Sequence, residues 1–282
     1  MPDLDRIEVA YPDTPRILSI CFEPTNQCPG RCPYCLIEDH DGDHPTTTLR
    51  LVIDRMLSLG TVRFGFGGGE PLIRGDVFQL GAQVRERGGG ALLRTSGMFR
   101  LEVQETNDSF DWVDLSLDSS DRDVFRRCRP GVPFEVLTDN IDRLADGAVR
   151  TRVSILLTSR NVRTVEQTVT WLAEHGVTDV RLQRLVPRGK ARVTWNKLKL
   201  PGAVEDNVMD EMSHLGRVLG IRVRELRTVS EATLCIVKGD GALYSGEPTG
   251  IRHRGSVFRD ADVTTVADLL FDAQMKAYCV GH

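Results

Sequence analysis

The sequence predicts an α/β fold: a partial (β/α)6 TIM-like barrel with a C-terminal extension that covers the barrel mouth. The first observation is that six short apolar runs alternate with amphipathic stretches between residues 17 and 185. Strands that alternate with helices form parallel sheets through right-handed crossovers. The second is that polar and glycine-rich segments follow these runs, at the strand ends where such barrels place their chemistry. The third is that the regular alternation of apolar runs and amphipathic stretches ends after Pro187.

The six apolar runs are short, and the fifth is rich in the β-branched residues that favour strands. They cover residues 17–22, 62–66, 91–94, 112–117, 149–157 and 180–185. Between the first two, residues 48–59 have helical spacing, with Leu49, Ile53 and Leu57 on one face. Further helices are predicted at 77–87, 134–144 and 164–175.

The chain beyond Pro187 carries shorter elements. We predict a helix at 204–219, strands at 221–226, 234–237 and 242–244, and a closing helix at 263–276. Gly239-Asp240-Gly241 lies between two of these strands and predicts a hairpin. We therefore expect two parts. Residues 1–187 form the barrel core with the main site, and residues 188–282 form an extension that contributes to a substrate site.

The composition is that of an ordinary globular protein, with 40% hydrophobic residues, a formal net charge of -4 and a pI of about 5.9. We expect no nucleic acid partner, and we expect the run Arg126, Arg127 and Arg129 to be a solvated helix end. No apolar stretch approaches the length of a membrane span, and residues 1–11 are too polar for a signal peptide. We therefore expect no membrane partner and a cytoplasmic location, where cysteines stay reduced.

Cys28, Cys32 and Cys35 form a C-x3-C-x2-C pattern in a loop rich in proline and glycine. Soft thiolates bind zinc, copper(I) or iron–sulfur clusters. A structural zinc site takes four ligands, and His40 or His44 would have to supply the fourth. Three cysteines leave one iron of a four-iron cubane open for an external ligand, as a catalytic cluster needs. The spacing therefore favours an iron–sulfur cluster, with zinc as the alternative.

Gly67-Gly68-Gly69-Glu70-Pro71 follows the second predicted strand directly. By itself such a glycine run indicates a tight turn or a nest of backbone amides. The carboxylate within it is a suitable partner for an ammonium group.

Together, the cysteine triplet and the glycine motif resemble the signature of the radical S-adenosylmethionine superfamily. The resemblance covers about residues 17–188. It is closest to the branch that contains molybdenum-cofactor cyclases and peptide and natural-product maturases. It implies a [4Fe–4S] cluster whose open iron chelates S-adenosylmethionine. Reductive cleavage of that cofactor gives a 5′-deoxyadenosyl radical, which abstracts a hydrogen atom from the substrate.

The resemblance also implies roles for the motif residues. Cys28, Cys32 and Cys35 would bind the cluster, and Tyr34 would lie near the adenine. The methionine ammonium group would be held by the second motif, through Gly68, Gly69, Glu70 and Pro71. Residues at the ends of the later strands would border the rest of the cofactor: Thr95, Ser96, Ser116, Asp118, Ser154 and Val186. For this last set, turn capping and strand packing are the alternative.

The match departs from that branch in the C-terminal part. Its members often bind auxiliary clusters through C-terminal cysteines, but the expected ligand position after Tyr244 is Ser245 here. We therefore expect one [4Fe–4S] cluster. Cys235 is either a small buried residue or a catalytic thiol that returns a hydrogen atom to the substrate radical. Cys128 and Cys279 are alternatives for that second role.

The implied function is a radical enzyme of specialised metabolism acting on a small metabolite or a short peptide, by epimerisation, dehydrogenation or a related reaction. Flavodoxin or ferredoxin would supply the electron. One alternative is a cyclase-like enzyme that modifies a nucleotide. Its phosphates would be bound by basic residues if these converge at the barrel mouth: Arg126, Arg127, Arg129, Arg152, Arg181, Arg184, Arg188 and Lys190. The other alternative is a non-enzymatic binding protein stabilised by zinc.

Overall fold

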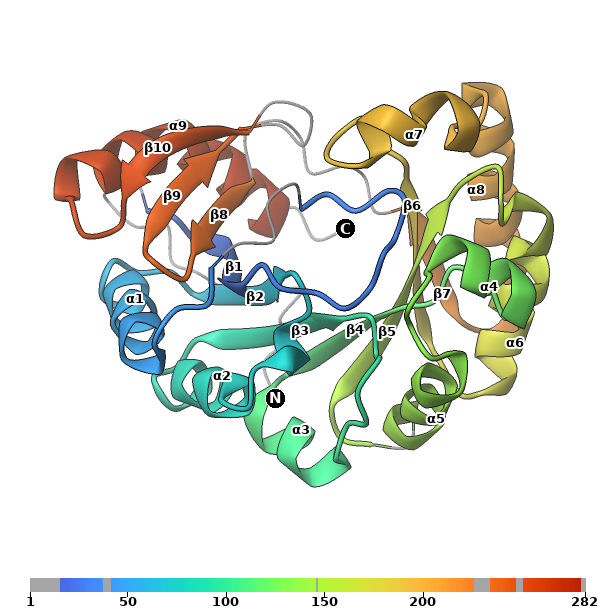
Figure 1. Cartoon of the computed structure of the whole chain (residues 1–282), viewed down its shortest axis with the longest axis horizontal. Helices are drawn as coiled ribbons and strands as arrows, with labels where there is room; N and C mark the ends of the chain where they lie inside the picture. The colour runs from blue at the N-terminus through green and yellow to red at the C-terminus, as the bar shows by residue number, and fades with distance from the viewer. Residues whose placement is uncertain (1–15, 38–41, 146, 226–233, 247–250, 280–282) are drawn as a thin grey trace. The chain divides into compact units, whose positions relative to one another are not determined.

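The computed structural model describes residues 16–37, 42–145, 147–225, 234–246 and 251–279 (Figure 1). The chain divides into two compact units. The first comprises Met1–Gln27, Asp41–Leu93 and Val229–His282, and the second comprises Cys28–His40 and Arg94–Thr228. Within the described residues, no helix is long and apolar enough to cross a membrane.

The first unit is built on a mixed sheet with the strand order β10-β9-β8-β1-β2-β3. Strands β8, β1, β2 and β3 run parallel, and β8, β9 and β10 form an antiparallel meander. The strands are β1 (Ser19–Thr25), β2 (Arg63–Gly68), β3 (Gly90–Thr95), β8 (Cys235–Lys238), β9 (Ala242–Ser245) and β10 (Arg252–Ser256). The helices are α1 (Thr46–Ser58), η1 (Pro71–Ile73), α2 (Val77–Glu86) and α9 (Asp260–Cys279).

Apolar packing and one buried amide hold the first unit together. The rings of Phe22 on β1 and Phe66 on β2 meet edge to face, with centroids 5.5 Å apart. From α9, the Gln274 side chain accepts a hydrogen bond from the backbone N–H of Leu18 (2.7 Å) and donates one to the carbonyl of Ser19 (3.0 Å). The C-terminal helix is therefore tied to the first strand at both polar groups of one side chain.

The second unit is built on four parallel strands in the order β4-β5-β6-β7. The strands are β4 (Trp112–Ser116), β5 (Arg150–Leu157), β6 (Asp179–Arg184) and β7 (Arg222–Glu225). The helices are α3 (Val103–Ser109), α4 (Arg122–Cys128), α5 (Phe134–Ala145), η2 (Val162–Thr164), α6 (Val165–Glu174), α7 (Ala191–Leu198) and α8 (Gly202–Leu219).

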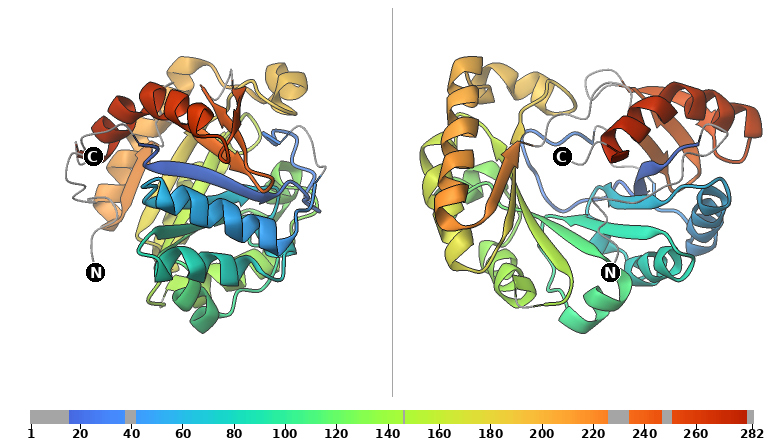
Figure 2. Two further views of the ribbon diagram at one scale, coloured as in Figure 1. Left: turned by 90° about the vertical axis from the view of Figure 1, so that its left-hand side faces the viewer. Right: turned by 180° about the vertical axis from the view of Figure 1, so that it is seen from behind.

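The two faces of the β4–β7 sheet differ in polarity. Alternate strand residues point to opposite faces, and one set is apolar and buried: Val113, Leu115, Val153, Ile155, Val180, Leu182 and Val223. Helices α5, α6 and α8 lie on one side of these strands (Figure 1 and Figure 2). The other set of strand residues is polar and charged.

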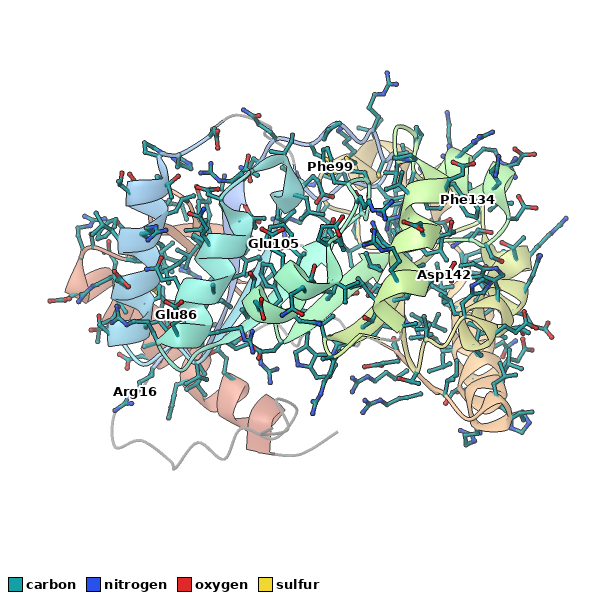
Figure 3. All side chains as sticks on the ribbon, turned by 90° about the horizontal axis from the view of Figure 1, so that it is seen from below. Arg16, Glu86, Phe99, Glu105, Phe134 and Asp142 are labelled. Atoms are coloured by element: carbon teal, nitrogen blue, oxygen red, sulfur yellow. The ribbon has the colours of Figure 1, made fainter. Side chains whose placement is uncertain are left out.

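The helices of both units keep their polar residues toward solvent. Figure 3 shows Glu86 on α2 and Asp142 on α5 on the outer sides of their helices, and both are exposed. The buried residues of α1 recur at helical spacing, at Leu49, Val52, Ile53 and Met56. This amphipathic pattern is the one from which the helices are predicted.

All six predicted strands occur within a few residues of their expected bounds, and the hairpin between β8 and β9 is confirmed. The predicted strand at 221–226 is β7, which pairs in parallel with β6 in the second unit. Helices α3, α4 and α7 and strand β10 are additional to the prediction. The compact units divide the chain elsewhere than at residue 187, and the predicted division into a core and an extension remains a prediction.

Candidate functional site

Residues 28–35 form a loop in the second unit, called the cysteine loop below, and three backbone contacts fix its course. The N–H of Arg31 donates to the carbonyl of Pro130 (2.8 Å). The carbonyl of Cys35 accepts from the N–H of Lys190 (2.9 Å), and the Thr194 hydroxyl donates to the carbonyl of Pro33 (2.8 Å). The loop is therefore held between the connection of α4 to α5 and the start of α7.

Glycine makes one of these contacts possible. Gly189 has φ +57°, and a Cβ there would lie 2.3 Å from the carbonyl oxygen of Cys35. Because no side chain fits in that space, the backbone after Pro187 can lie directly against the third cysteine.

The three cysteines of the loop are suited to an iron–sulfur cluster in donor type and exposure. Cys28, Cys32 and Cys35 are all partly exposed, so an inorganic group can reach each sulfur. Thiolates are the usual ligands of such clusters. Among the described residues, no three His, Cys, Asp or Glu side chains surround the position of a single metal ion. His44 is described, whereas His40 lies outside the described residues.

Asp118 connects the cysteine loop to the sheet. Its side chain is fully buried, and the Tyr34 hydroxyl donates a hydrogen bond to its Oδ2. The N–H of Leu156 donates to Oδ1 (2.9 Å), and Arg129 forms an ion pair with Oδ2 (Nε to Oδ2, 2.8 Å). The carboxylate thus joins the loop, the end of α4 and strand β5. Its expected place beside the ribose stays a prediction.

The charges of Asp118 and Arg129 compensate each other next to Cys32. Burial opposes the charge of Arg129, but Asp118 more than offsets this, and the pKa of the guanidinium is raised. Burial raises the pKa of Cys32, while Arg129 acts in the opposite direction. Burial also raises the pKa of Tyr34, so its hydroxyl stays protonated and remains a donor to Asp118.

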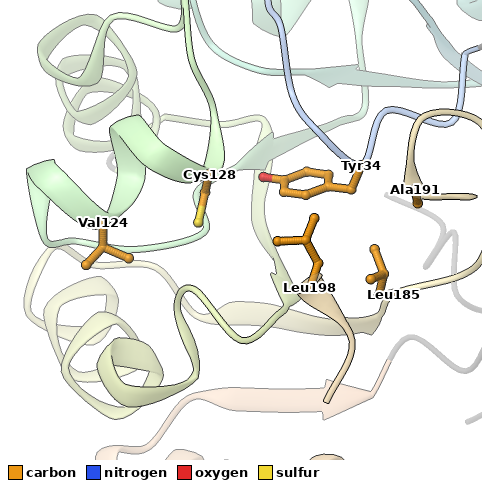
Figure 4. Close-up of a cluster of buried hydrophobic side chains, with 6 residues drawn as sticks. All are labelled: Tyr34, Val124, Cys128, Leu185, Ala191 and Leu198. Atoms are coloured by element: carbon orange, nitrogen blue, oxygen red, sulfur yellow. The ribbon is translucent and has the colours of Figure 1, made fainter. Parts of the chain in front are cut away.

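The ring of Tyr34 lies in an apolar cluster (Figure 4). Its buried neighbours are Val124, Cys128, Leu185, Ala191 and Leu198. Burial raises the pKa of Cys128 to about 12, so this sulfur is a neutral thiol. The ring of Tyr34 is thus fixed by apolar packing, and its hydroxyl is fixed by the hydrogen bond to Asp118.

The glycine motif lies in the first unit at the end of β2. The N–H of Gly69 donates to the carbonyl of Thr25 (2.9 Å), and that of Glu70 to the carbonyl of Gln27 (2.8 Å). The Glu70 carboxylate is 1% exposed and accepts from the N–H of Leu72 (3.1 Å). Pro71 begins the short helix η1. The motif is therefore a tight turn that holds a buried carboxylate at a strand end.

Alanine at Gly69 is expected to destabilise the chain by about 1–3 kcal/mol, because its Cβ would overlap the backbone. That Cβ would lie 2.1 Å from the carbonyl oxygen of Gln27 and 2.6 Å from the carbonyl of Asn26. Thermal unfolding of Gly69→Ala measures the loss. Gly75→Ala is the matched control, since a Cβ there meets no atom within 4 Å. Equal stability of the two variants would contradict the close approach.

The remaining predicted residues lie on strands or shortly after them, in the second unit. The Thr95 hydroxyl accepts a hydrogen bond from the N–H of Gly97 (3.0 Å), and Ser96 is partly exposed beside it. Ser116 lies opposite Ser154 in the register of β4 and β5. The Ser154 hydroxyl donates to Asp114 (2.6 Å), and the carbonyl of Val186 accepts from the N–H of Arg188 (2.8 Å). Their contacts to a cofactor stay predictions.

Cys235 is the first residue of β8 in the first unit and is buried. Burial raises its pKa, and the neighbouring Cys21 adds to the effect. The sulfur is therefore a neutral thiol, the form from which a hydrogen atom can be taken. Its catalytic role stays a prediction. The side chain of the alternative, Cys279, lies outside the described residues.

Arg129 is a residue whose role the sequence analysis missed. The expectation that the whole run is a solvated helix end holds for Arg126 and Arg127, which are exposed. It is wrong for Arg129, which pairs with buried Asp118. A signal was present in the spacing: Phe125 and Cys128 are buried on α4, and Arg129 continues that face at i+4 from Phe125.

The basic residues considered for nucleotide phosphates do not gather at one place within the described structure. Arg184 forms ion pairs with Glu205 (3.2 Å), Asp206 (2.7 Å) and Glu225 (2.6 Å). Arg152 and Arg181 lie on the opposite, polar face of the sheet. The three members on strands are therefore divided between two faces. Arg129, Arg152 and Arg184 have acidic partners, and Arg126 and Arg127 are exposed.

Comparison with known proteins supports the interpretation of the two motifs. The family model described as "Radical SAM superfamily" matches residues 22–172. Mycofactocin maturase MftC of Mycobacterium tuberculosis is 27% identical over 188 residues, which are 64% of this chain and 48% of that protein. AdoMet-dependent heme synthase of Nitratidesulfovibrio vulgaris is 27% identical over 194 residues, 63% of this chain and 51% of that protein. The chain thus spans about half the length of these curated relatives.

Solved structures share the fold. Streptococcus suis SuiB bound to S-adenosylmethionine matches with a TM-score of 0.71 and 13% identity, over 93% of this chain and 68% of that one. anSMEcpe with bound AdoMet and Kp18Cys peptide matches with a TM-score of 0.69 and 17% identity, over 93% of this chain and 83% of that one. The predicted α/β fold of the partial-barrel type is confirmed by this similarity.

Proposed function

The chain belongs to the radical SAM superfamily, and from that premise we propose that it is an enzyme that reductively cleaves S-adenosylmethionine and abstracts a hydrogen atom from a short peptide. The names of its relatives support a peptide over another small molecule. MftC is a maturase, and SuiB and anSMEcpe have been solved with peptides bound. The cytoplasmic location and a flavodoxin or ferredoxin as electron donor belong to the same proposal.

The observation that carries the proposal is the cysteine loop. Its three cysteines are partly exposed, and its backbone is held by Pro130, Lys190 and Thr194. In this proposal Cys28, Cys32 and Cys35 hold one [4Fe–4S] cluster. When bound, that cluster supplies the electron and the open iron that binds the cofactor. Tyr34, next to the third cysteine in the sequence, is fixed by Asp118 and by its apolar neighbours.

Glu70 is assigned to the ammonium group of the cofactor. Its carboxylate is buried and has one backbone donor, the N–H of Leu72. A charge-assisted hydrogen bond is about twice as strong as a neutral one. The backbone carbonyls around Gly68 and Gly69 would accept the remaining ammonium protons, and Pro71 ends the turn. The buried position keeps water away from this ion pair.

Glutamine at Glu70 is expected to weaken the binding of S-adenosylmethionine about tenfold or more, because it removes the negative charge while its amide oxygen can still accept from Leu72. Equilibrium binding to the anaerobically reconstituted protein measures the change. Glu86→Gln, at an exposed position on α2 of the same unit, is the control and should bind like the parent. Unchanged affinity in Glu70→Gln would remove Glu70 from the cofactor site.

The proposed function itself is tested by anaerobic reconstitution and metal analysis, followed by an assay for 5′-deoxyadenosine with dithionite. About four irons per chain and formation of 5′-deoxyadenosine support the proposal with a single cluster. About eight irons would reject the single cluster and restore auxiliary ligands. Bound zinc, or no cleavage of the cofactor, would reject the function and favour the zinc-stabilised binding protein.

A further inference from the structure

The polar face of β4–β7 in the second unit carries two rows of side chains set by strand register. The first, called the acid–base row, alternates in charge and consists of Asp114, Arg152, Asp179 and Arg222. The second, called the arginine row, lies two residues further along each strand and consists of Ser116, Ser154, Arg181 and Arg224. Together the two rows hold four arginines and two aspartates.

The acid–base row has its charges paired. Asp179 Oδ2 forms ion pairs with Arg152 (Nε, 3.3 Å), Arg224 (Nη2, 3.1 Å) and Arg222 (Nη2, 3.7 Å). Arg152 also lies over the ring of Trp112, 4.4 Å from its centroid. Asp114 accepts the hydroxyl of Ser154 (2.6 Å). Each of the two aspartates therefore already has a donor. Asp179 is shared by three arginines.

Arg181 is different, because no carboxylate of the described residues lies within ion-pair distance of it. Its Nε is buried and has no hydrogen-bond partner. Burial, together with nearby Arg152 and Arg224, lowers the pKa of its guanidinium to about 9, although Asp114 and Asp179 act in the opposite direction. The group remains charged at neutral pH, but its surroundings disfavour that charge. Arg181 is a partly buried cation without a carboxylate at ion-pair distance, and a bound anion would compensate its charge.

We propose that Arg181 binds a carboxylate of the substrate, with the hydroxyl of Ser116 in the same row as a second donor; the Ser154 hydroxyl between them already donates to Asp114. This inference rests on the proposed peptide-modifying function, since a peptide offers carboxylates at its C-terminus and at acidic side chains. A planar carboxylate matches the two parallel N–H donors of a guanidinium. A phosphate dianion fits less well, because Asp114 and Asp179 lie one row away.

The position of the arginine row suits a substrate group. Ser116 is the last residue of β4, and Asp118, which anchors Tyr34 of the cysteine loop, follows two residues later. Two residues of strand correspond to about 7 Å. Arg181 is the third of the six residues of β6. A carboxylate bound to it would therefore sit one step along the strands from the level of Asp118, toward their amino-terminal ends and on the polar face of the sheet.

A pair of variants separates a ligand-binding arginine from a structural one. Arg152→Met removes a partner of Asp179 and is expected to lower the melting temperature by roughly 5–10 °C. Arg181→Met removes this partly buried charge and is expected to leave the melting temperature unchanged or to raise it. If Arg181→Met loses as much stability as Arg152→Met, Arg181 is a structural counter-ion and the proposal is wrong.

Binding is tested on the anaerobically reconstituted protein with acetylglycine as the probe and acetylglycinamide as its neutral counterpart. At several times its Kd, the acid should raise the melting temperature by about 2–4 °C at constant ionic strength, and the amide should not. The rise should disappear in Arg181→Met and persist in Arg163→Met, an exposed control in the same unit. An equal rise in both variants, or no difference between acid and amide, would overturn the proposal. Formation of 5′-deoxyadenosine is measured separately, so the proposed function can stand when this inference fails.

Discussion

Replacing Cys28, Cys32 and Cys35 together by alanine is expected to reduce bound iron from about four atoms per chain to almost none, and to abolish cleavage of S-adenosylmethionine. Each thiolate supplies one ligand, and without ligands the cluster cannot form. Iron and sulfide analysis after anaerobic reconstitution measures the first effect. Chromatographic detection of 5′-deoxyadenosine after reduction measures the second.

The control for this experiment is Cys128→Ala. Cys128 is a buried thiol beside Tyr34, but it lies outside the cysteine loop and packs among apolar side chains. It should retain its iron, although removing a buried sulfur will cost some stability. The backbone bonds of the loop do not involve the three sulfurs, so the triple variant should still fold. Retained cofactor cleavage in a folded triple variant would show that these cysteines are not the cluster ligands.

Asparagine at Asp118 is expected to lower the free energy of unfolding by about 3–5 kcal/mol, because it leaves the buried charge of Arg129 without a partner. The substitution keeps the size of the side chain, but its single oxygen can accept from only one of Tyr34 and Leu156, which now donate to different oxygens of Asp118. The loss therefore combines the charge with one hydrogen bond. Chemical denaturation of the Asp118→Asn variant measures it. Tyr34→Phe, which removes one hydrogen bond and no charge, should cost only about 1 kcal/mol.

A double variant separates this charge effect from a general loss of packing. Arg129→Met alone leaves Asp118 buried without its cation and should also destabilise the chain. Asp118→Asn combined with Arg129→Met removes both charges and should recover most of the loss, giving a coupling energy of about 2 kcal/mol or more. If the two single losses simply add, the Asp118–Arg129 ion pair does not contribute as described.

Much of the fold could be predicted because its signals are local. Strands β1 to β6 carry short runs of apolar residues, alternating with polar ones in β4, β5 and β6, and the hairpin of β8 and β9 has an Asp-Gly turn. Strand β10 was missed because its sequence, Arg-His-Arg-Gly-Ser, has no strand pattern. It is an edge strand whose structure depends on pairing with β9, and local propensity carries no information about that pairing.

In the candidate site too, the residues of local motifs could be predicted and the contacts between distant residues could not. The cysteines and Glu70 stand in short contiguous motifs, so the sequence alone indicates their chemistry. The contact of Tyr34 with Asp118 joins residues 84 positions apart, and Arg224 meets Asp179 across 45 positions. These contacts depend on the order and register of the parallel strands. A pattern of residue types does not specify register, and the unpaired state of Arg181 was therefore not predictable.

The backbone anchoring of the cysteine loop has a consequence for how the protein meets oxygen. The bonds that hold the loop run from Pro130, Lys190 and Thr194 to peptide groups, and none uses a metal. In small zinc modules the metal creates the fold, and removing it unfolds the chain. Here hydrogen bonds to the backbone hold the loop, so its course should not depend on a bound metal. Oxidative loss of the inorganic core should leave a folded apoprotein, so damage at this centre is repairable by reloading rather than by replacement of the polypeptide.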